Sequence, residues 1–210
     1  VIMTRIPYFD AHCDTITAVF QNGGSLFENG FHLDLKRLSG FEPAAQVFAV
    51  WNGHFKEKAA LLKSELNKHA GIAAFCRTTA EGREAAKNGK IAAFLSVEGA
   101  EQLLCSVEEL RAAHEGDGVV MINLCWNSDN ALCGSAMDGG GGLTAKGRAF
   151  VRAAQEMGVI IDLSHASEKA FWDVMDITVR PVIASHSNSA ALYSAFPRNL
   201  TDAQFIALSN

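Results

Sequence analysis

The sequence of 210 residues lacks the features that mark secreted or membrane-spanning proteins. Its five cysteines are scattered and odd in number, and no CxxC motif is present. This pattern argues against a disulfide framework and favours a reducing compartment, so we expect a cytoplasmic protein. No apolar run approaches the ~18 residues that a membrane span needs. The N-terminal segment has neither the basic start nor the long apolar run of a signal peptide.

Positive charge is also scarce. Lys and Arg number 18 against 23 Asp and Glu, which gives a formal net charge of −5. We therefore expect no nucleic-acid partner, because the chain has no broad basic footprint. Hydrophobic residues make up 49% and charged residues 20%, which is ordinary for a globular protein and excludes disorder as a description of the whole chain.

Two glycine-based phosphate-binding motifs are missing as well. The first apolar run is not followed by a Rossmann fingerprint, which argues against an open doubly wound sheet. Four consecutive glycines occupy positions 139–142, but no strand directly precedes them and no GK[ST] follows. We expect a flexible loop there rather than a phosphate cradle.

Short apolar runs alternate with amphipathic segments along the chain. The runs are nearly continuously apolar, as in strands covered on both faces, and lie at 6–11, 45–51, 91–97, 119–124, 159–163 and 181–184. Helices are predicted between them at 56–70, 79–87 and 145–157, with further helix starts at Ser106, Ser167 and Thr201. The alternation predicts βαβ units and a parallel sheet within a single domain over residues 1–210.

Polar side chains follow several of the predicted strands. His12 and Asp14 follow the first, Glu98 follows the third, and His165 and His186 end the last two. Such a distribution fits a barrel whose active site gathers strand ends around one axis. A TIM barrel typically needs ~250 residues and eight strands, whereas six runs are present here.

These residue types also suit metal binding. Side chains alternate along a strand, so His12 and Asp14 should point the same way and Cys13 the opposite way. A carboxylate beside an apolar strand, as at Glu98, is costly unless it is paired or coordinated. Three imidazoles and two carboxylates without a thiolate suit Zn²⁺ or Mn²⁺, and two metals can share them if one carboxylate bridges. Each residue taken alone more often makes ordinary hydrogen bonds.

Six segments together resemble the renal or membrane dipeptidases, peptidase family M19. They are Phe-Asp-Ala-His-Cys-Asp-Thr (9–15), Ser-Val-Glu-Gly-Ala-Glu (96–101), Gly-Leu-Thr-Ala-Lys-Gly-Arg (142–148), Ile-Asp-Leu-Ser-His (161–165), Ala-Ser-His-Ser (184–187) and Arg-Asn-Leu-Thr-Asp (198–202). The match is collinear over essentially the whole chain. It implies an α/β fold, a TIM (β/α)8 barrel of the metal-dependent amidohydrolase type, of which this chain covers about the first six strand–helix units.

The resemblance also implies the activity and the metal ligands. His12 and Asp14 would bind one zinc ion, His165 and His186 would bind a second, and Glu98 would bridge the two. A hydroxide held between the metals would attack the scissile carbonyl of a dipeptide. The expected enzyme is therefore a zinc-dependent dipeptidase with two Zn²⁺ per chain.

Three further residues are substrate-binding candidates by the same resemblance. Arg198 would hold the free carboxylate of the substrate, because its guanidinium fork matches a carboxylate. Mammalian members carry a substrate-contacting His where this chain, like bacterial members, has Trp126 and Asn127. The family's proton-transfer Asp follows its eighth strand, so we expect it beyond residue 210. The family often forms dimers, which makes a homodimer an expectation here.

Two other functions stay open. Another binuclear amidohydrolase would act on a lactone, a cyclic amide or an N-acyl amino acid, and Arg198 favours a substrate with a carboxylate. A truncated, catalytically inactive metal-binding homologue is the other alternative, supported by the missing Asp.

Overall fold

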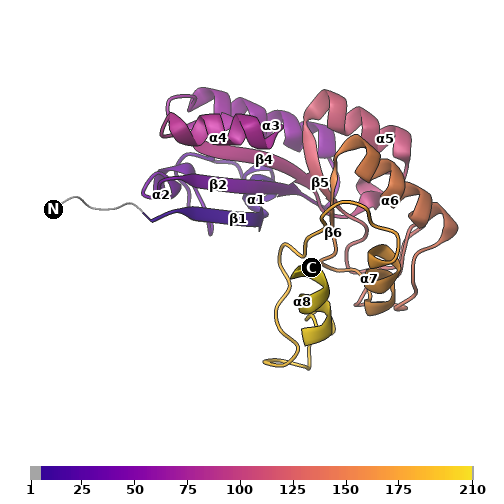
Figure 1. Cartoon of the computed structure of the whole chain (residues 1–210). Coiled ribbons are helices and arrows are strands. Elements are labelled where there is room, and N and C mark those ends of the chain that lie inside the picture. The colour runs from indigo at the N-terminus through magenta and orange to yellow at the C-terminus, as the bar shows by residue number, and fades with distance from the viewer. Residues whose placement is uncertain (1–5, 210) are drawn as a thin grey trace. The chain divides into compact units, whose positions relative to one another are not determined.

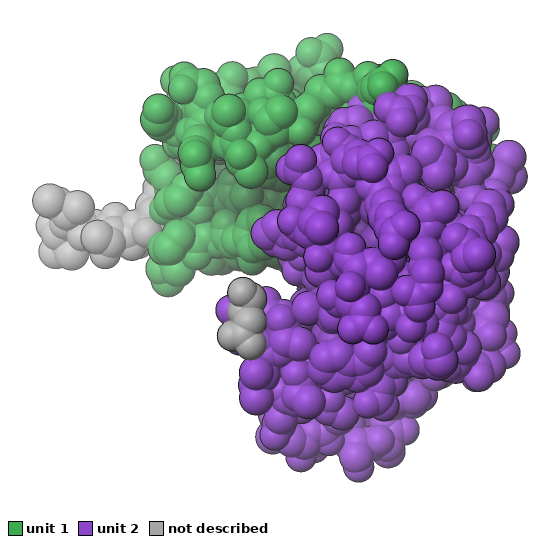
Figure 2. All heavy atoms as spheres, turned by 45° about the vertical axis from the view of Figure 1, so that its right-hand side comes forward, with its two compact units in different colours: residues 1–96, 115–120 green, residues 97–114, 121–210 purple. Residues whose placement is uncertain are grey.

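The computed structural model describes residues 6–209 and divides into two compact units (Figures 1 and 2). Unit 1 comprises residues 1–96 and 115–120, and unit 2 comprises residues 97–114 and 121–210. Strands β4 (Ile91–Val97) and β5 (Val119–Asn123) each pass from one unit into the other. The single domain that the sequence predicts over residues 1–210 stays a prediction.

Unit 1 is built on parallel strands. β1 (Tyr8–Cys13) pairs with β2 (Ala44–Val50), and the register of this pair shifts between Asp10 and Cys13. β2 pairs in turn with β4, and the short β3 (Ala73–Phe75) pairs with the start of β4. Phe48 and Val50 of β2 are fully buried, which agrees with the continuous apolar run from which the strand was predicted.

Four helices belong to unit 1: α1 (Thr15–Asn22), α2 (Leu35–Leu38), α3 (Phe55–Lys68) and α4 (Thr79–Lys87). In α3, Leu62 and Leu66 stand four residues apart and are both buried. A capping box between Thr78 and Glu81 begins α4. Figure 1 shows α3 and α4 along one face of the strands, and α4 packs against β2 and β3.

Unit 2 holds the second part of the chain. β5 pairs in parallel with β6 (Ile160–Asp162), with Met121 opposite Ile160. Its helices are η1 (Ala100–Leu103, a 3-10 turn), α5 (Val107–Ala112), α6 (Ala145–Met157), α7 (Glu168–Met175) and α8 (Asp202–Ser209), and the π-helical turn η2 (Ala113–Asp117) leads back to unit 1. Phe150 of α6 and Phe171 of α7 are buried. Within residues 6–209, no helix combines the length and apolar character that crossing a membrane requires.

One predicted strand is wrong and one strand was missed. Residues 181–184 do not form a strand, and only Ile183 makes an isolated parallel bridge with Asp162. Pro181 contributes to this because proline has no N–H to donate to a ladder. The missed strand is β3, whose Ala73-Ala74 pair carries little of the β-branched or aromatic character that signals a strand.

The four-glycine segment at 139–142, predicted as a flexible loop, makes specific contacts at its C-terminal end. A Cβ atom on Gly134 would overlap the backbone of Gly141, and one on Gly142 would overlap the carboxylate of Asp173. The hydroxyl of Ser167 donates to the carbonyl of Gly141 at 2.6 Å. Gly134 and Gly142 thus allow close approach of backbone and side chains, whereas Gly140 and Gly141 are exposed and a Cβ there would meet no other atom, so the flexible loop stays a prediction.

Candidate functional site

Three ligand-type side chains converge in unit 2. Glu98 follows β4, His165 lies three residues after β6, and His186 follows the bridge at Ile183. His165 Nε2 lies 2.7 Å from Glu98 Oε1 and 2.9 Å from His186 Nε2, and His186 Nε2 lies 3.5 Å from the same carboxylate oxygen. Glu98 and His165 are only 4% and 2% exposed. The three donor atoms therefore form a compact, largely dehydrated cluster suited to one metal ion.

The outer nitrogen of each histidine ring also has a partner. His165 Nδ1 lies 2.9 Å from Asn127 Oδ1, and an amide oxygen can only accept, so Nδ1 carries the proton. Ser185 donates its hydroxyl to the Asp162 carboxylate, so its oxygen accepts from His186 Nδ1 at 2.7 Å. Both Nε2 atoms are therefore left with a lone pair directed at the cluster.

This donor set fits a divalent cation. Two imidazole lone pairs and a carboxylate oxygen repel one another at these distances unless a positive charge lies between them. Burial lowers the pKa of His165 and the Arg198 charge lowers it further, while the Glu98 carboxylate, with which a protonated ring would pair, opposes them. The neutral imidazole is the form that binds metals, and nitrogen and oxygen donors without sulfur are ligands that Zn²⁺ accepts.

His165 has an unusual backbone. Its φ angle is +75°, in the left-handed region that non-glycine residues rarely adopt. Its carbonyl oxygen accepts from the Ala136 N–H at 2.9 Å and from the Ser135 hydroxyl at 3.4 Å, which holds this conformation. Such conformations cluster at functional sites, where surrounding contacts maintain them.

Asp162 forms hydrogen bonds with the two segments that carry His165 and His186. It is fully buried, and its Oδ1 accepts from the backbone N–H groups of Ser164 and Ser185, each at 3.0 Å. The buried carboxylate thus ties the segment that ends in His165 to the segment that ends in His186.

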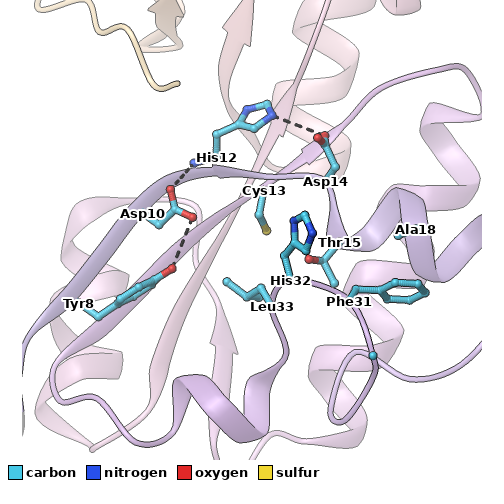
Figure 3. A pocket seen from close by; sticks show the side chains of 11 residues that line it. Tyr8, Asp10, His12, Cys13, Asp14, Thr15, Ala18, Phe31, His32 and Leu33 are labelled. Atoms are coloured by element: carbon cyan, nitrogen blue, oxygen red, sulfur yellow. Dashed lines mark hydrogen bonds and ion pairs between the residues drawn. The ribbon is translucent and has the colours of Figure 1, made fainter. Parts of the chain in front are cut away.

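The other predicted ligand pair lies in unit 1. His12 ends β1 and Asp14 is the N-cap of α1, and His12 Nε2 lies 3.5 Å from Asp14 Oδ1. Figure 3 shows these two side chains on one side of the strand and the Cys13 thiol on the other, as the alternation predicts. Burial raises the pKa of Cys13 to about 12, so this thiol stays protonated at neutral pH.

A cavity of about 640 Å³ lies beside this pair. It is lined by Tyr8, Asp10, His12, Cys13, Asp14, Thr15, Ala18, Gly30, Phe31, His32 and Leu33 (Figure 3). Tyr8 and Asp10 join Gln46 in a hydrogen-bond network, in which Gln46 Nε2 donates to Asp10 Oδ2 at 3.1 Å. The sequence analysis did not identify Tyr8 and Asp10 as lining residues of this cavity. Their spacing offered a signal, because Tyr8, Asp10 and His12 occupy every second position of β1.

Arg198 in unit 2 carries buried hydrogen-bond donors that have no partner among residues 6–209. These donors are its Nε and Nη2 atoms. Burial lowers the pKa of Arg198, and the carboxylates of Glu98 and Asp162 oppose this effect. A buried guanidinium with unused donors is costly unless a ligand supplies acceptors, and a carboxylate supplies two in matching geometry.

The remaining candidates lie close to the histidine cluster. The Trp126 ring is tilted by 44° against the His165 ring at a centroid distance of 6.4 Å, and Trp126 is 36% exposed. The structure thus brings Glu98, His165, His186 and Asn127 together within unit 2. His12 and Asp14 belong to unit 1, and a joint metal centre of all five ligands stays a prediction.

Parallel strands that alternate with helices, together with a largely buried Glu–His–His cluster beyond their carboxyl ends, are typical of metal-dependent hydrolases of the TIM-barrel class. The sequence profile of the membrane dipeptidases, peptidase family M19, matches residues 1–210. The chain belongs to this family.

Solved structures and a curated relative agree. A metallopeptidase from Rhodobacter sphaeroides, solved with a phosphinate mimic of the dipeptide L-Ala-D-Ala, is 26% identical with a TM-score of 0.84, covering 98% of this chain and 71% of that one. A dipeptidase of family M19 is 28% identical with a TM-score of 0.82, covering 98% and 70%. A dipeptidase of Claviceps purpurea is 39% identical over 109 residues, which are 50% of this chain and 25% of that protein.

These comparisons confirm two predictions from the sequence. The fold class is a partial TIM-type α/β barrel, since the chain matches about seven-tenths of each solved relative. The enzyme class is a metallo-dipeptidase of the membrane dipeptidase type.

Proposed function

We propose that this chain forms the metal-binding part of a zinc-dependent dipeptidase. The observation that carries the proposal is the cluster of Glu98, His165 and His186, whose donor atoms lie within 3.5 Å of one another while the outer ring nitrogens are already hydrogen-bonded. Membership of family M19 supports the same assignment.

The proposal includes two zinc ions per chain. His165 and His186 hold one, His12 and Asp14 hold the other, and Glu98 bridges them. The 3.5 Å separation of His12 and Asp14 donor atoms is compatible with a shared ion. The bridging role of Glu98 rests on the family motif, and its burial supports it because a buried carboxylate needs compensating positive charge.

The proposed substrate is a dipeptide. Arg198 holds its C-terminal carboxylate through the two buried nitrogens that lack partners among residues 6–209. The Rhodobacter sphaeroides relative was solved with a dipeptide mimic, which supports a dipeptide for this chain also. Trp126, beside the His165 ring, is placed to contact the substrate.

Zinc, when bound, supplies a hydroxide at neutral pH and polarises the scissile carbonyl. The residues of the chain do the rest of the positioning. Glu98 and the two histidines hold the metal, and Arg198 holds the substrate carboxylate. The scissile carbonyl is thereby oriented toward the metal. We keep the expectation that an Asp beyond residue 210 transfers the proton to the leaving amine.

Compartment and assembly are part of the proposal. The five cysteines are all free thiols, and four of them are buried, which supports a reducing compartment such as the cytoplasm. A homodimer is proposed from the family, and sedimentation of the purified protein tests it.

The decisive experiment measures zinc content and hydrolysis together, on residues 1–210 and on the complete gene product. We expect two zinc ions per chain and cleavage of Ala-Ala-type dipeptides by the complete product. A panel with lactones, cyclic amides and N-acyl amino acids separates the other amidohydrolases. Zinc binding without turnover of any substrate would favour the inactive homologue, and a complete product without bound metal would overturn the ligand assignment.

A further inference from the structure

Asn127 contacts His165, although the sequence predicts that Asn127 contacts the substrate. The sequence made it a candidate for touching the substrate, yet its amide oxygen lies 2.9 Å from His165 Nδ1. This nitrogen is on the side of the ring opposite to Nε2, the atom that lies near Glu98 and His186. Asn127 therefore contacts the far side of a proposed metal ligand.

The direction of this hydrogen bond fixes the chemistry of the ring. The oxygen of an amide accepts and cannot donate, so the proton of a neutral His165 must reside on Nδ1. The lone pair then lies on Nε2, where a metal ion needs it. With the proton on Nε2 instead, the ring would present a proton to the ion and leave two acceptors facing each other at Nδ1.

His186 follows the same rule with a different partner. The Ser185 hydroxyl donates a hydrogen bond to the Asp162 carboxylate and accepts one from His186 Nδ1 at 2.7 Å. The two histidines thus reach the same tautomer through an amide oxygen in one case and a hydroxyl oxygen in the other. This parallel makes the Asn127 contact part of a built arrangement.

The segment that carries Asn127 is anchored on both sides. Before it, the carbonyl of Trp126 accepts from the Ser135 hydroxyl at 2.8 Å. After it, Asp129 Oδ1 accepts from the Ser135 N–H at 2.7 Å, and Asn130 Nδ2 donates to the Leu124 carbonyl at 2.8 Å. These bonds close the segment on itself, so the amide is held in place before any ligand arrives.

We propose that Asn127 is a positioning residue for the metal, which sets the tautomer and orientation of His165 and thereby raises the affinity of the site formed by Glu98, His165 and His186. This proposal rests on the proposed function, because it assumes that these three residues bind a metal. Supporting groups of this kind commonly change metal affinity by ~10–100-fold when they are removed.

The test compares two substitutions of similar size. Asn127→Leu removes the acceptor, and Asn127→Asp keeps an acceptor because a carboxylate can only accept. Ser128→Ala, at the exposed neighbouring position, is the matched control. The variants are prepared in the complete gene product, and Zn²⁺ and Co²⁺ affinities are measured by chelator competition, with the Co²⁺ absorption spectrum as a second readout of the ligand geometry.

We expect Asn127→Leu to weaken metal binding by ~10–100-fold and to alter the Co²⁺ spectrum. Asn127→Asp and Ser128→Ala should bind as tightly as the wild type or, for the carboxylate, more tightly. Nitrogen NMR of the Zn²⁺-loaded wild type should show His165 protonated at Nδ1 and bound to the metal through Nε2. Thermal unfolding of the metal-free variants checks that Asn127→Leu folds.

The outcomes separate the two proposals. If the wild type binds no metal, the proposed function fails and this inference with it. If the wild type binds metal and Asn127→Leu binds equally well, or Asn127→Asp binds as weakly as Asn127→Leu, only the positioning role is overturned. A raised KM with unchanged metal affinity in Asn127→Leu would return Asn127 to the substrate-contact role.

Discussion

Replacing Arg198 by methionine should remove substrate binding while leaving the fold intact. Two of its guanidinium nitrogens are buried without partners among residues 6–209, so they are free to bind a carboxylate. Hydrogen bonds to charged groups are worth ~1.5–3 kcal/mol each. Two such bonds give a loss of about 3 kcal/mol or more, which lowers kcat/KM by roughly 100-fold.

Arg198→Met should not lower the free energy of unfolding, whereas the loss of one partner of a structural ion pair would lower it. Breaking a buried ion pair costs ~3–5 kcal/mol because it strands the partner charge. Among residues 6–209, Arg198 forms no ion pair with Glu98 or Asp162, although both carboxylates raise its pKa against the effect of burial. Arg198→Met removes a partly buried charge with two unused donors, so the unfolding midpoint should stay the same or rise.

The assay compares a dipeptide with the same dipeptide amidated at its C-terminus. The wild type should discriminate strongly between them, and Arg198→Met should hydrolyse both at similarly low rates. Arg152→Met, on the exposed side of α6, is the control and should behave as wild type. The reasoning is refuted if Arg198→Met keeps the discrimination, or if it lowers the free energy of unfolding by the ~3–5 kcal/mol of a structural pair.

Three further predictions concern stability. Asp34 is 3% exposed and caps α2, so Asp34→Ala should lower the free energy of unfolding by about 2 kcal/mol in urea titrations with an unchanged slope. Burial raises the pKa of Asp117, but hydrogen bonds from Lys56 and Lys63 outweigh it and leave the pKa below its ordinary value. That stabilisation is present above the unfolded pKa of ~3.9 and is lost as pH falls through the folded value, so the Tm deficit of Asp117→Asn at pH 7 should shrink in acid scans below that pH. Phe150 is fully buried in α6, and Phe150→Ala should cost ~3–5 kcal/mol by calorimetry or urea unfolding.

Much of the fold was predictable because local signals agree with long-range packing. The helices at 79–87 and 145–157 begin and end where predicted, since Thr144 and Gly158 supply strong start and stop signals for the second. The strand β3 and the bridge at Ile183 were not predictable in the same way. Whether each segment forms a strand depends on how many hydrogen bonds the neighbouring strand makes with it. A three-residue strand also has too few residues to show a periodic pattern.

The site shows the same division between local and distant information. Residue type and spacing indicated His165 and His186 as ligands, because each ends an apolar run with the same Ser-His pair. The hydrogen-bond partner of each imidazole ring could not be predicted from the sequence. Asn127 lies 38 positions from His165 in the chain, and a hydrogen bond at that separation is set by the fold.

The contacts at the C-terminal end of the four-glycine segment affect where the chain can be cut or extended. Composition suggests a site for protease nicking, for a tag or for an inserted domain, since exposed glycine-rich tips tolerate such changes. Here the backbone of Gly141 lies against Gly134 and accepts from Ser167, and Asp173 accepts from the N–H of Leu143 at 2.8 Å. An epitope inserted beside Gly142 should therefore disturb these contacts and lower the unfolding midpoint, whereas an insertion at the exposed Gly140 should be tolerated.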